Sequence, residues 1–160
     1  MSAAQKIAAA FILWAIRRAR HSVRVVTFGG DLLFFRYQFL WPDEYLWARS
    51  DGTQTMVDAL PWWRPFNAFV HRWCPAPELR ESIHDHPRWS ITICLRGRII
   101  ERTPWGERLL KPGSIVFRSH KAIHSFEVPA GYRGKTWTLF IVGRRKHRQN
   151  TYVVTPQGGA

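Results

Sequence analysis

The pair His84 and His86 is the part of the sequence that most directly suggests chemistry. Successive side chains of a β-strand point to opposite faces, so two histidines that flank one residue share a face. Two imidazoles placed in this way can converge on one metal ion at about 2.0–2.1 Å. A solvent-facing strand could carry the same pair without any metal. The question is therefore whether these histidines face inward.

The residues after His86 keep two distinct phases. The phase of the histidines is polar or small and the opposite phase is apolar, with Arg88, Ser90, Thr92 and Cys94 set against Trp89, Ile91, Ile93 and Leu95. An ordinary half-buried strand would turn its apolar face to the core and its polar face to water. A small barrel with a polar interior would do the reverse. The pattern alone leaves both interpretations open.

The chain from Val23 onward predicts an antiparallel β fold with the strands closed into a barrel or jelly roll. Short apolar or alternating runs recur at roughly eight to twelve residues, and turn residues such as Lys111-Pro112-Gly113 separate them. No long helical pattern lies between the runs, which disfavours parallel βαβ units. The predicted strands are Val23–Phe28, Leu33–Trp41, Tyr45–Ala48, Ala68–Trp73, Trp89–Leu95, Arg98–Arg102, Glu107–Leu110, Ser114–Arg118, His124–Val128 and Thr136–Val142.

The N-terminal segment, residues 1–22, predicts a basic, apolar helix over Ser2–Arg20. An arginine cluster follows its apolar stretch, where a secretory signal would place small residues and a cleavage site. A mitochondrial presequence remains an alternative, although the segment is unusually apolar for one. Two further interpretations are open: the helix packs on the β domain or on a second subunit, or it lies in a membrane interface.

Composition sets outer limits on the class of protein. The chain has 160 residues, of which 46% are hydrophobic and 14% aromatic, so it is not disordered as a whole. Two cysteines exclude a disulfide scaffold and a four-cysteine zinc ribbon. No apolar run reaches the roughly 18–20 residues of a membrane span. We therefore expect a cytoplasmic protein, with peripheral attachment to a membrane surface as the alternative.

The net charge of +13 is concentrated at the two ends of the chain, because all eleven acidic residues lie between Asp31 and Glu127. Basic ends can meet an anionic membrane surface, an acidic protein partner or nucleic acid. They can also be an ordinary solvated surface. The sequence contains no helix-turn-helix, zinc-finger or RNA-binding motif, which disfavours nucleic acid as the partner.

The histidine spacing resembles the cupin superfamily, whose fold is a small β-barrel or jelly roll. The first cupin motif is His-x-His, three or four residues, an acid, six residues and Gly; here His84 and His86 are followed by Ser90 at the acid position and by Gly97. In the second motif Gly113 and His124 stand at the expected positions, while Ser119, Lys121 and Val128 replace its Pro, Gly and Asn. The resemblance covers residues 66–143 and implies a cupin domain over 23–148, with a tail at 149–160.

By this resemblance His84, His86 and His124 are the metal-ligand candidates. The serine at the acid position implies a neutral three-histidine site, similar to that of the thiol dioxygenases in this superfamily. Three neutral imidazoles leave the full charge of the ion available to an anionic substrate, and they suit iron(II), zinc, nickel or copper rather than magnesium or calcium. We expect iron(II) or zinc. The alternative is a cupin that has lost its metal.

Other residues have weaker claims to a role at this site. Arg88 and Arg96 share the phase of the histidines and could bind a substrate carboxylate or phosphate; Arg88 could instead cap the barrel or form an ion pair. Ser90 occupies the acid position. His120 could be a fourth ligand or a proton shuttle, and His71 could support a ligand from behind.

These observations lead to two main hypotheses about function. The first is a metal-dependent cupin enzyme, a non-haem oxygenase acting on a small anionic molecule. The second is a non-catalytic cupin module that docks through its basic ends and N-terminal helix on a membrane or a larger protein assembly. The apolar face of the Trp89–Leu95 strand needs a cover under either hypothesis, which a second sheet, the Leu33–Trp41 strand or a partner subunit in a homodimer could supply.

Overall fold

The computed structural model describes residues 2–19, 21–26, 32–39, 46–50, 53–57, 65–74, 84–86, 88–132 and 134–144. These residues form one α-helix, one short 3-10 helix and eleven strands. The helices are α1 (Ala3–Arg18) and η1 (Ala130–Tyr132). The strands are β1 (His21–Val26), β2 (Leu32–Gln38), β3 (Leu46–Ser50), β4 (Thr53–Val57), β5 (Phe66–Trp73), β6 (Ser90–Arg96), β7 (Ile99–Thr103), β8 (Gly106–Leu110), β9 (Ile115–Arg118), β10 (Ser125–Glu127) and β11 (Trp137–Gly143).

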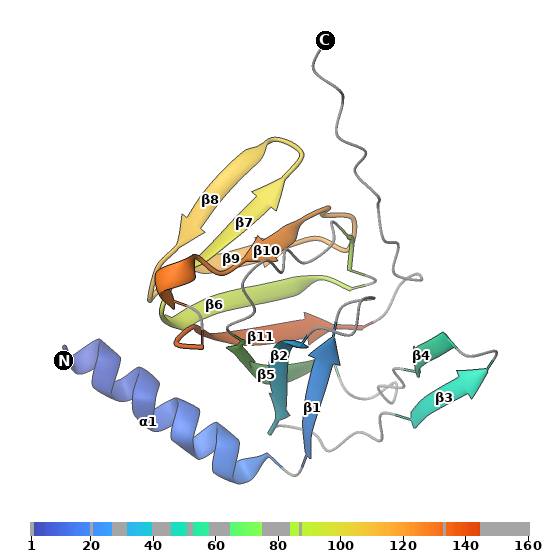
Figure 1. The fold of residues 1–160 in the computed structure, drawn as a ribbon, viewed down its shortest axis with the longest axis horizontal. Helices are drawn as coiled ribbons and strands as arrows, with labels where there is room; N and C mark the ends of the chain where they lie inside the picture. Colours follow the sequence, from blue (N-terminus) through green and yellow to red (C-terminus); the bar gives the residue numbers. More distant parts are fainter. Residues whose placement is uncertain are drawn as a thin grey trace.

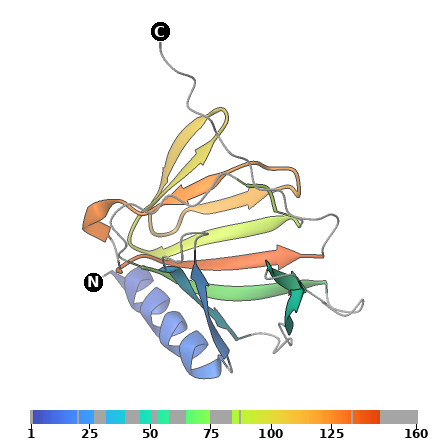
Figure 2. The same ribbon diagram turned by 45° about the vertical axis from the view of Figure 1, so that its right-hand side comes forward.

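Two antiparallel sheets form the body of the protein (Figure 1). The larger sheet has six strands in the order β1-β2-β5-β11-β6-β9, and the smaller has three in the order β10-β7-β8. β3 and β4 form a separate two-stranded sheet. Figures 1 and 2 show the β7–β8 hairpin at one end of the molecule and α1 at the other, beside β2 and β5. This architecture confirms the predicted mainly-β, antiparallel jelly roll with an N-terminal helix.

β6 settles which of its two phases faces inward. Ser90, Thr92 and Cys94 are buried, whereas the apolar residues between them are only partly buried. The polar phase therefore faces the interior of the jelly roll, and the apolar phase forms the outer side of the larger sheet. The histidines that precede β6 enter the same interior, which is the inverted arrangement expected of a barrel with a functional interior.

Apolar side chains from both sheets fill much of the interior. A buried cluster joins residues of β2, β5, β6, β7, β8, β9 and β10, namely Phe34, Trp73, Cys94, Ile99, Leu110, Val116 and Phe126. Their burial removes apolar surface from water and stabilises the packing of the smaller sheet on the larger one. The polar residues of the interior are thus held on a rigid apolar support.

Two glycines make the reversals that bring the strands back over one another. Gly97, between β6 and β7, has φ 80°, and Gly113, between β8 and β9, has φ 91°. Side chains other than glycine rarely adopt such values. At Gly97 an added Cβ would also lie 2.4 Å from Oγ1 of Thr136. These are the two glycines of the motif spacing, and Gly97 is required for both conformation and space.

α1 begins at a capping box. The Ser2 side chain accepts a hydrogen bond from the backbone N–H of Gln5 at 3.3 Å, and the Gln5 side chain accepts one from the backbone N–H of Ser2 at 2.8 Å. Ile12 and Ala15 are the buried residues of the helix, which contacts β2, β5 and β6. No helix among the described residues is both long enough and apolar enough to cross a membrane.

The ten predicted strands are all present, with small shifts at their ends. His124 and Val128 flank β10 instead of lying within it. The sequence does not predict β4, whose Thr-Gln-Thr start lacks an apolar alternation. The predicted strand ends at Phe28, Trp41 and Tyr45, together with the tail at 149–160, lie outside the described residues.

Candidate metal centre

A two-residue antiparallel bridge brings His84 and His124 together. The N–H of His84 donates to the carbonyl oxygen of His124 at 2.9 Å, and the N–H of His124 donates back to the carbonyl oxygen of His84 at 2.9 Å. His84 lies before β6 of the larger sheet and His124 lies before β10 of the smaller one. Residues paired in this way present neighbouring side chains on one face, so the backbone itself places two imidazoles side by side.

His86 completes a near-equilateral triangle of imidazoles. Its ring centre lies 4.8 Å from that of His84 and 4.9 Å from that of His124, and the His84 and His124 ring centres are 5.1 Å apart. One ligand atom from each ring can be chosen so that all lie within 4.8 Å of one another. His84 and His124 are buried, and His86 is partly buried. The structure thus assembles the three predicted ligand candidates at one point.

The geometry and the chemistry of this triangle fit a transition-metal ion. Imidazoles that share one ion at about 2.1 Å place their ring centres roughly 5 Å apart, as these rings are. Their nitrogens would then be about 3.4 Å apart, so a small rotation of the rings would complete the site. Three nitrogen donors suit iron, zinc, nickel or copper, whereas magnesium and calcium require oxygen ligands.

His86 is held in the protonation state that a metal requires. Burial lowers the pKa of His86 well below its usual value, and the neighbouring His124, His84, Arg118 and Arg36 lower it further. A buried neutral imidazole keeps a lone pair available for a metal ion. The ring can therefore act as a ligand at neutral pH without first losing a proton.

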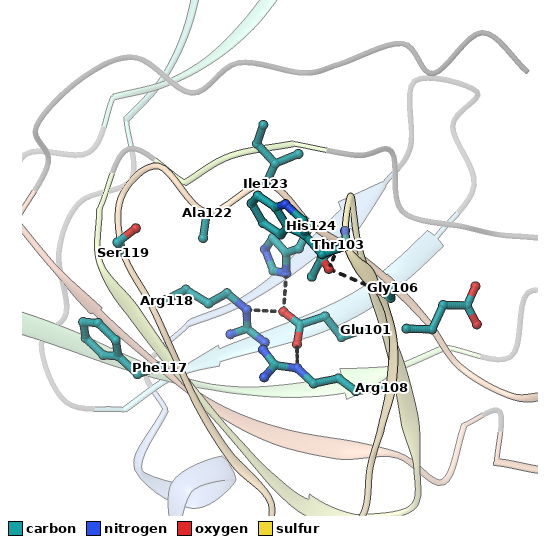
Figure 3. Close-up of a pocket in the computed structure, with 12 residues that line it drawn as sticks. Glu101, Thr103, Gly106, Arg108, Phe117, Arg118, Ser119, Ala122, Ile123 and His124 are labelled. Carbon is teal, nitrogen blue, oxygen red and sulfur yellow. Dashed lines mark hydrogen bonds and ion pairs between the residues drawn. The ribbon is translucent and has the colours of Figure 1, made fainter. Parts of the chain in front are cut away.

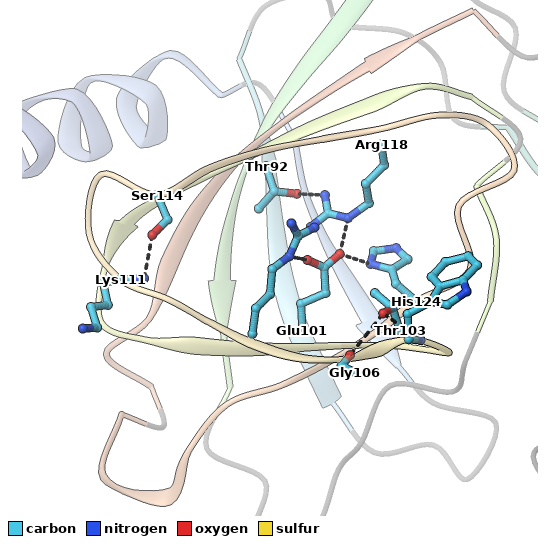
Figure 4. Close-up of polar contacts among 10 residues, drawn as sticks. Thr92, Glu101, Thr103, Gly106, Lys111, Ser114, Arg118 and His124 are labelled. Atoms are coloured by element: carbon cyan, nitrogen blue, oxygen red, sulfur yellow. Dashed lines mark hydrogen bonds and ion pairs between the residues drawn. The ribbon is translucent and has the colours of Figure 1, made fainter.

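A buried carboxylate, Glu101 of β7, supports His124 from behind (Figure 4). Its Oε1 atom lies 3.1 Å from Nδ1 of His124 and also accepts a hydrogen bond from Nε of Arg118. Its Oε2 atom accepts from Nε of Arg108. Arg118 in turn donates to Oγ1 of Thr92 at 2.7 Å. Glu101 is completely buried, so these partners are what hold its charge inside the protein.

The ionised form of Glu101 has a direct consequence for His124. Burial alone raises the pKa of Glu101, but the hydrogen bonds from His124, Arg118 and Arg108 outweigh it and hold that pKa well below its usual range. A carboxylate at Nδ1 fixes the proton of the imidazole on that nitrogen and leaves Nε2 as the ligand atom. Glu101 therefore fixes the tautomer and the orientation that a metal ligand needs.

A large pocket opens on the side of His124 (Figure 3). Its volume is about 440 Å³, within the usual range of small-molecule sites. Charged side chains form its floor, while the β7–β8 turn and the β9–β10 connection form its walls. The lining residues are Glu101, Thr103, Trp105, Gly106, Glu107, Arg108, Phe117, Arg118, Ser119, Ala122, Ile123 and His124.

A second, much smaller cavity lies on the side of His86, inside the jelly roll. Its volume is about 30 Å³, which is room for one or a few molecules the size of water. Its walls are mostly aromatic: Phe34, Arg36, His71, Trp73, His86, Thr92, Phe126, Thr138 and Phe140. The histidine triangle therefore contributes to two spaces, a large pocket through His124 and a small inner cavity through His86.

Three of the candidate supporting residues lie outside the triangle. Ser90 is completely buried, and its hydroxyl makes no hydrogen bond within the described part of the chain. His71 lines the inner cavity; its Nε2 accepts a hydrogen bond from Nε of Arg36 at 3.1 Å, and its ring stacks on Phe34 at 4.5 Å. His120 is partly buried in the turn between β9 and β10. None of the three belongs to the group of possible metal ligands among the described residues, which consists of His84, His86 and His124.

The two arginines expected to bind substrate lie elsewhere. Arg88 is buried, and its Nη1 donates to the carbonyl oxygen of Gly143 at 2.9 Å. Arg96 is exposed at the end of β6. Neither lines the large pocket or the inner cavity. Among the described residues, Arg108 and Arg118 are the arginines of the large pocket.

Sequence reasoning missed Glu101, Arg108 and Arg118 as residues of the site. Glu101 is in phase with the buried Ile99 on β7, which is a signal for an inward-facing acid. That signal is weak in the sequence, because Ile99-Ile100 precedes a Glu-Arg pair and either phase could face inward. The partner arginines come from β8 and β9, and only the folded structure brings them to one carboxylate.

Comparisons with known proteins place the fold. No protein-family model and no curated protein matches the chain. A structure of the DMSP lyase DddQ from Ruegeria pomeroyi matches with a TM-score of 0.54 and 19% identity, over 99% of this chain and 72% of that one. A cupin-like protein from Thermotoga maritima matches with a TM-score of 0.50 and 13% identity, over 74% of this chain and 75% of that one.

A third match comes from the crystal structures of the DMSP lyases RdDddP and RnDddQII, with a TM-score of 0.50 and 17% identity. The match covers 75% of this chain and 53% of that one, so it spans about half of the longer chain. Similarities at these identities concern architecture alone. Together with the two antiparallel sheets and the three clustered histidines, they establish that the chain has the cupin fold.

Proposed function

We propose that the protein is a metal-dependent enzyme, a non-haem oxygenase that acts on a small anionic molecule. One divalent ion, iron(II) or zinc, is held by His84, His86 and His124. The observation that carries this proposal is the convergence of three imidazoles whose ligand atoms lie within 4.8 Å of one another. Iron(II) would supply the redox chemistry with dioxygen that an oxygenase needs, whereas zinc would supply Lewis-acid activation.

Charge favours an anionic substrate. Three neutral imidazoles do not offset the charge of a divalent ion. The charged side chains that line the large pocket are Glu101, Glu107, Arg108 and Arg118, so their formal charges cancel before any ion binds. A divalent ion on three neutral imidazoles would therefore make the site positive. A carboxylate, phosphate or thiolate group would be attracted to it over a neutral group.

Arg108 is the residue that we assign to the anionic group of the substrate, in place of Arg88 and Arg96. It lines the large pocket, and its side chain is 50% exposed. Glu101 engages its Nε, and a guanidinium carries four further N–H donors. Trp105 and Phe117 line the same pocket and are 84% and 66% exposed. The favoured substrate therefore joins a small anionic group to an apolar part.

The inner cavity has a different role. Its volume of about 30 Å³ excludes an organic substrate, so such a substrate must approach from the large pocket. Aromatic walls pack against the His86 ring, with Phe140 at 5.4 Å between ring centres. The cavity is of a size that suits dioxygen or water.

Elemental analysis of the purified chain tests the metal. We expect about one iron or zinc per chain in the wild type and none in His84→Ala. His120→Ala is the matched control, because this histidine lies outside the triangle and should leave the metal content unchanged. An absence of metal in the wild type after anaerobic reconstitution with iron(II) and, separately, with zinc would refute the proposal.

Dioxygen uptake tests the reaction. The iron-loaded chain, mixed in turn with small thiols, carboxylates and phosphates, should consume dioxygen with at least one of them, and His84→Ala should not. Turnover of an anion without dioxygen uptake would keep the metal site but replace the oxygenase with a metal-dependent lyase or hydrolase. A metal-free, inactive chain would favour the second candidate, a non-catalytic cupin module, which the exposed apolar face of α1 also supports.

A further inference from the structure

α1 has an apolar face that the other described residues leave exposed. On its inner side Ile12 and Ala15 are buried. On its outer side Ile7, Leu13 and Trp14 are 70%, 55% and 51% exposed. Ile7 and Trp14 are seven residues apart and therefore lie almost on one line along the helix. Large apolar side chains in such a line are uncommon on a surface that faces only water.

Trp14 is held in place although half of it is exposed. Its ring contacts Phe11 with 5.7 Å between ring centres and Phe39 with 5.4 Å. These contacts anchor one edge of the indole to the protein and fix the direction of the other edge. Little side-chain freedom would then be lost when the exposed edge binds something, which favours binding.

The charged residues of α1 all have one sign. Lys6, Arg17 and Arg18 are exposed, and the helix contains no acidic residue. Arg18 lies one turn beyond Trp14 on the line of the apolar residues, and Lys6 and Arg17 lie on one flank of that line. A second copy of the chain docked through the same face would bring these cations together, which disfavours a symmetric contact.

We propose that α1 docks the protein on an anionic lipid surface. Ile7 and Trp14 enter the headgroup region, and Lys6, Arg17 and Arg18 contact the lipid phosphates. Tryptophan is suited to that region because its ring is apolar and its N–H is polar, and basic residues add electrostatic attraction. The contact is peripheral, and it does not depend on whether the histidines bind a metal.

Sedimentation of the full chain with sucrose-loaded vesicles tests the proposal. We expect binding to vesicles made of phosphatidylcholine and phosphatidylglycerol in equal parts, with little binding to pure phosphatidylcholine. Arg17→Gln combined with Arg18→Gln should weaken the partitioning by about five-fold for each charge removed. Trp14→Ser, and independently Ile7→Ser, should each weaken it by about ten-fold.

Leu109→Ser is the matched control. Leu109 is also an exposed apolar residue, but it lies on β8 in the smaller sheet, away from α1 (Figure 1). This variant should bind the vesicles as the wild type does. Equal loss in Leu109→Ser, equal binding of the wild type to neutral vesicles, or no binding to either would overturn the proposal.

Light scattering separates lipid from protein as the occupant of this face. The wild type and Trp14→Ser should have the same oligomeric state without lipid. A wild-type oligomer that Trp14→Ser dissociates would assign the face to a second copy of the chain.

A moderate rise in salt should displace the protein from anionic vesicles, because salt screens the attraction between exposed charges. Binding that does not change with salt would contradict the assigned role of the arginines.

Discussion

The two spaces beside the histidines differ in size, charge and access. The pocket at His124 measures about 440 Å³ and has ionised side chains on its floor. The cavity at His86 measures about 30 Å³ and has mainly aromatic walls. The same cluster of imidazoles thus has an open, charged side and a narrow, mostly aromatic side. Under the proposed function, substrate recognition would belong to the first side and positioning of the ligands to the second.

The largest expected effect comes from removing His84, the ligand candidate that lines neither space. His84→Ala should lower the metal affinity by well over about 100-fold, because it leaves two imidazoles and breaks the triangle. Competition with a chromophoric chelator measures this change. His120→Ala should retain wild-type affinity. If His84→Ala bound metal as tightly as the wild type, the two spaces would have no common metal centre between them.

The next effect comes from the charged floor. Glu101→Gln should lower the metal affinity by about 10- to 100-fold, because Gln cannot hold the His124 imidazole as a carboxylate does. It should also destabilise the fold by about 3 kcal/mol, because the buried Arg118 loses its counter-charge. Chelator competition and urea unfolding measure the two effects. Loss of stability with full metal affinity would make Glu101 a structural residue only.

The stability effect of Glu101→Gln should depend on pH. The pKa of Glu101 is lowered in the folded protein, so its charge contributes stability above the unfolded pKa of about 4.5. That contribution is lost as pH falls through the folded value. The difference in unfolding free energy between wild type and variant should therefore be largest near neutral pH and shrink in acid. A constant difference would contradict the role assigned to the charge.

A smaller effect is expected at the entrance to the open side. Arg108→Gln should raise the KM for the anionic substrate by about ten-fold with a smaller change in kcat, since it removes a contact present before and during reaction. Its effect on stability should stay below about 1 kcal/mol because the residue is half-exposed. Arg96→Gln is the control. Equal KM changes in both variants would remove the distinction between the pocket and the general surface.

The smallest effect is expected on the narrow side. Burial, and then Arg36, lowers the pKa of His71 well below its usual value. The neutral ring therefore contributes stability above the unfolded pKa of about 6.5, and this contribution is lost as pH falls below it. His71→Asn cannot titrate, so its unfolding free energy should fall less between pH 7 and pH 5, with a cost at pH 7 of about 1 kcal/mol. Metal content should not change.

Sequence patterns predicted the elements better than their contacts. The alternation along β6 marked a strand, and the offsets of Gly97, Gly113 and His124 indicated how the chain returns. Which face of β6 is inside was open, because a polar interior and a polar exterior produce the same alternation. Glu101 was missed for a related reason. Its partners are arginines on two other strands, and local periodicity does not predict which strands lie side by side.

The two backbone hydrogen bonds between His84 and His124 offer a way to detect metal binding by amide hydrogen exchange. Their two amide hydrogens are held by each other's carbonyl oxygens at 2.9 Å, so they exchange with solvent only when this bridge opens. An ion bound to the side chains of the same two residues would oppose that opening. Exchange at these two amides should therefore slow when metal is added, while the amide of Trp105 at the exposed turn keeps its rate. The exchange rates of these two amides would then report whether the metal is bound, and the measurement needs no substrate.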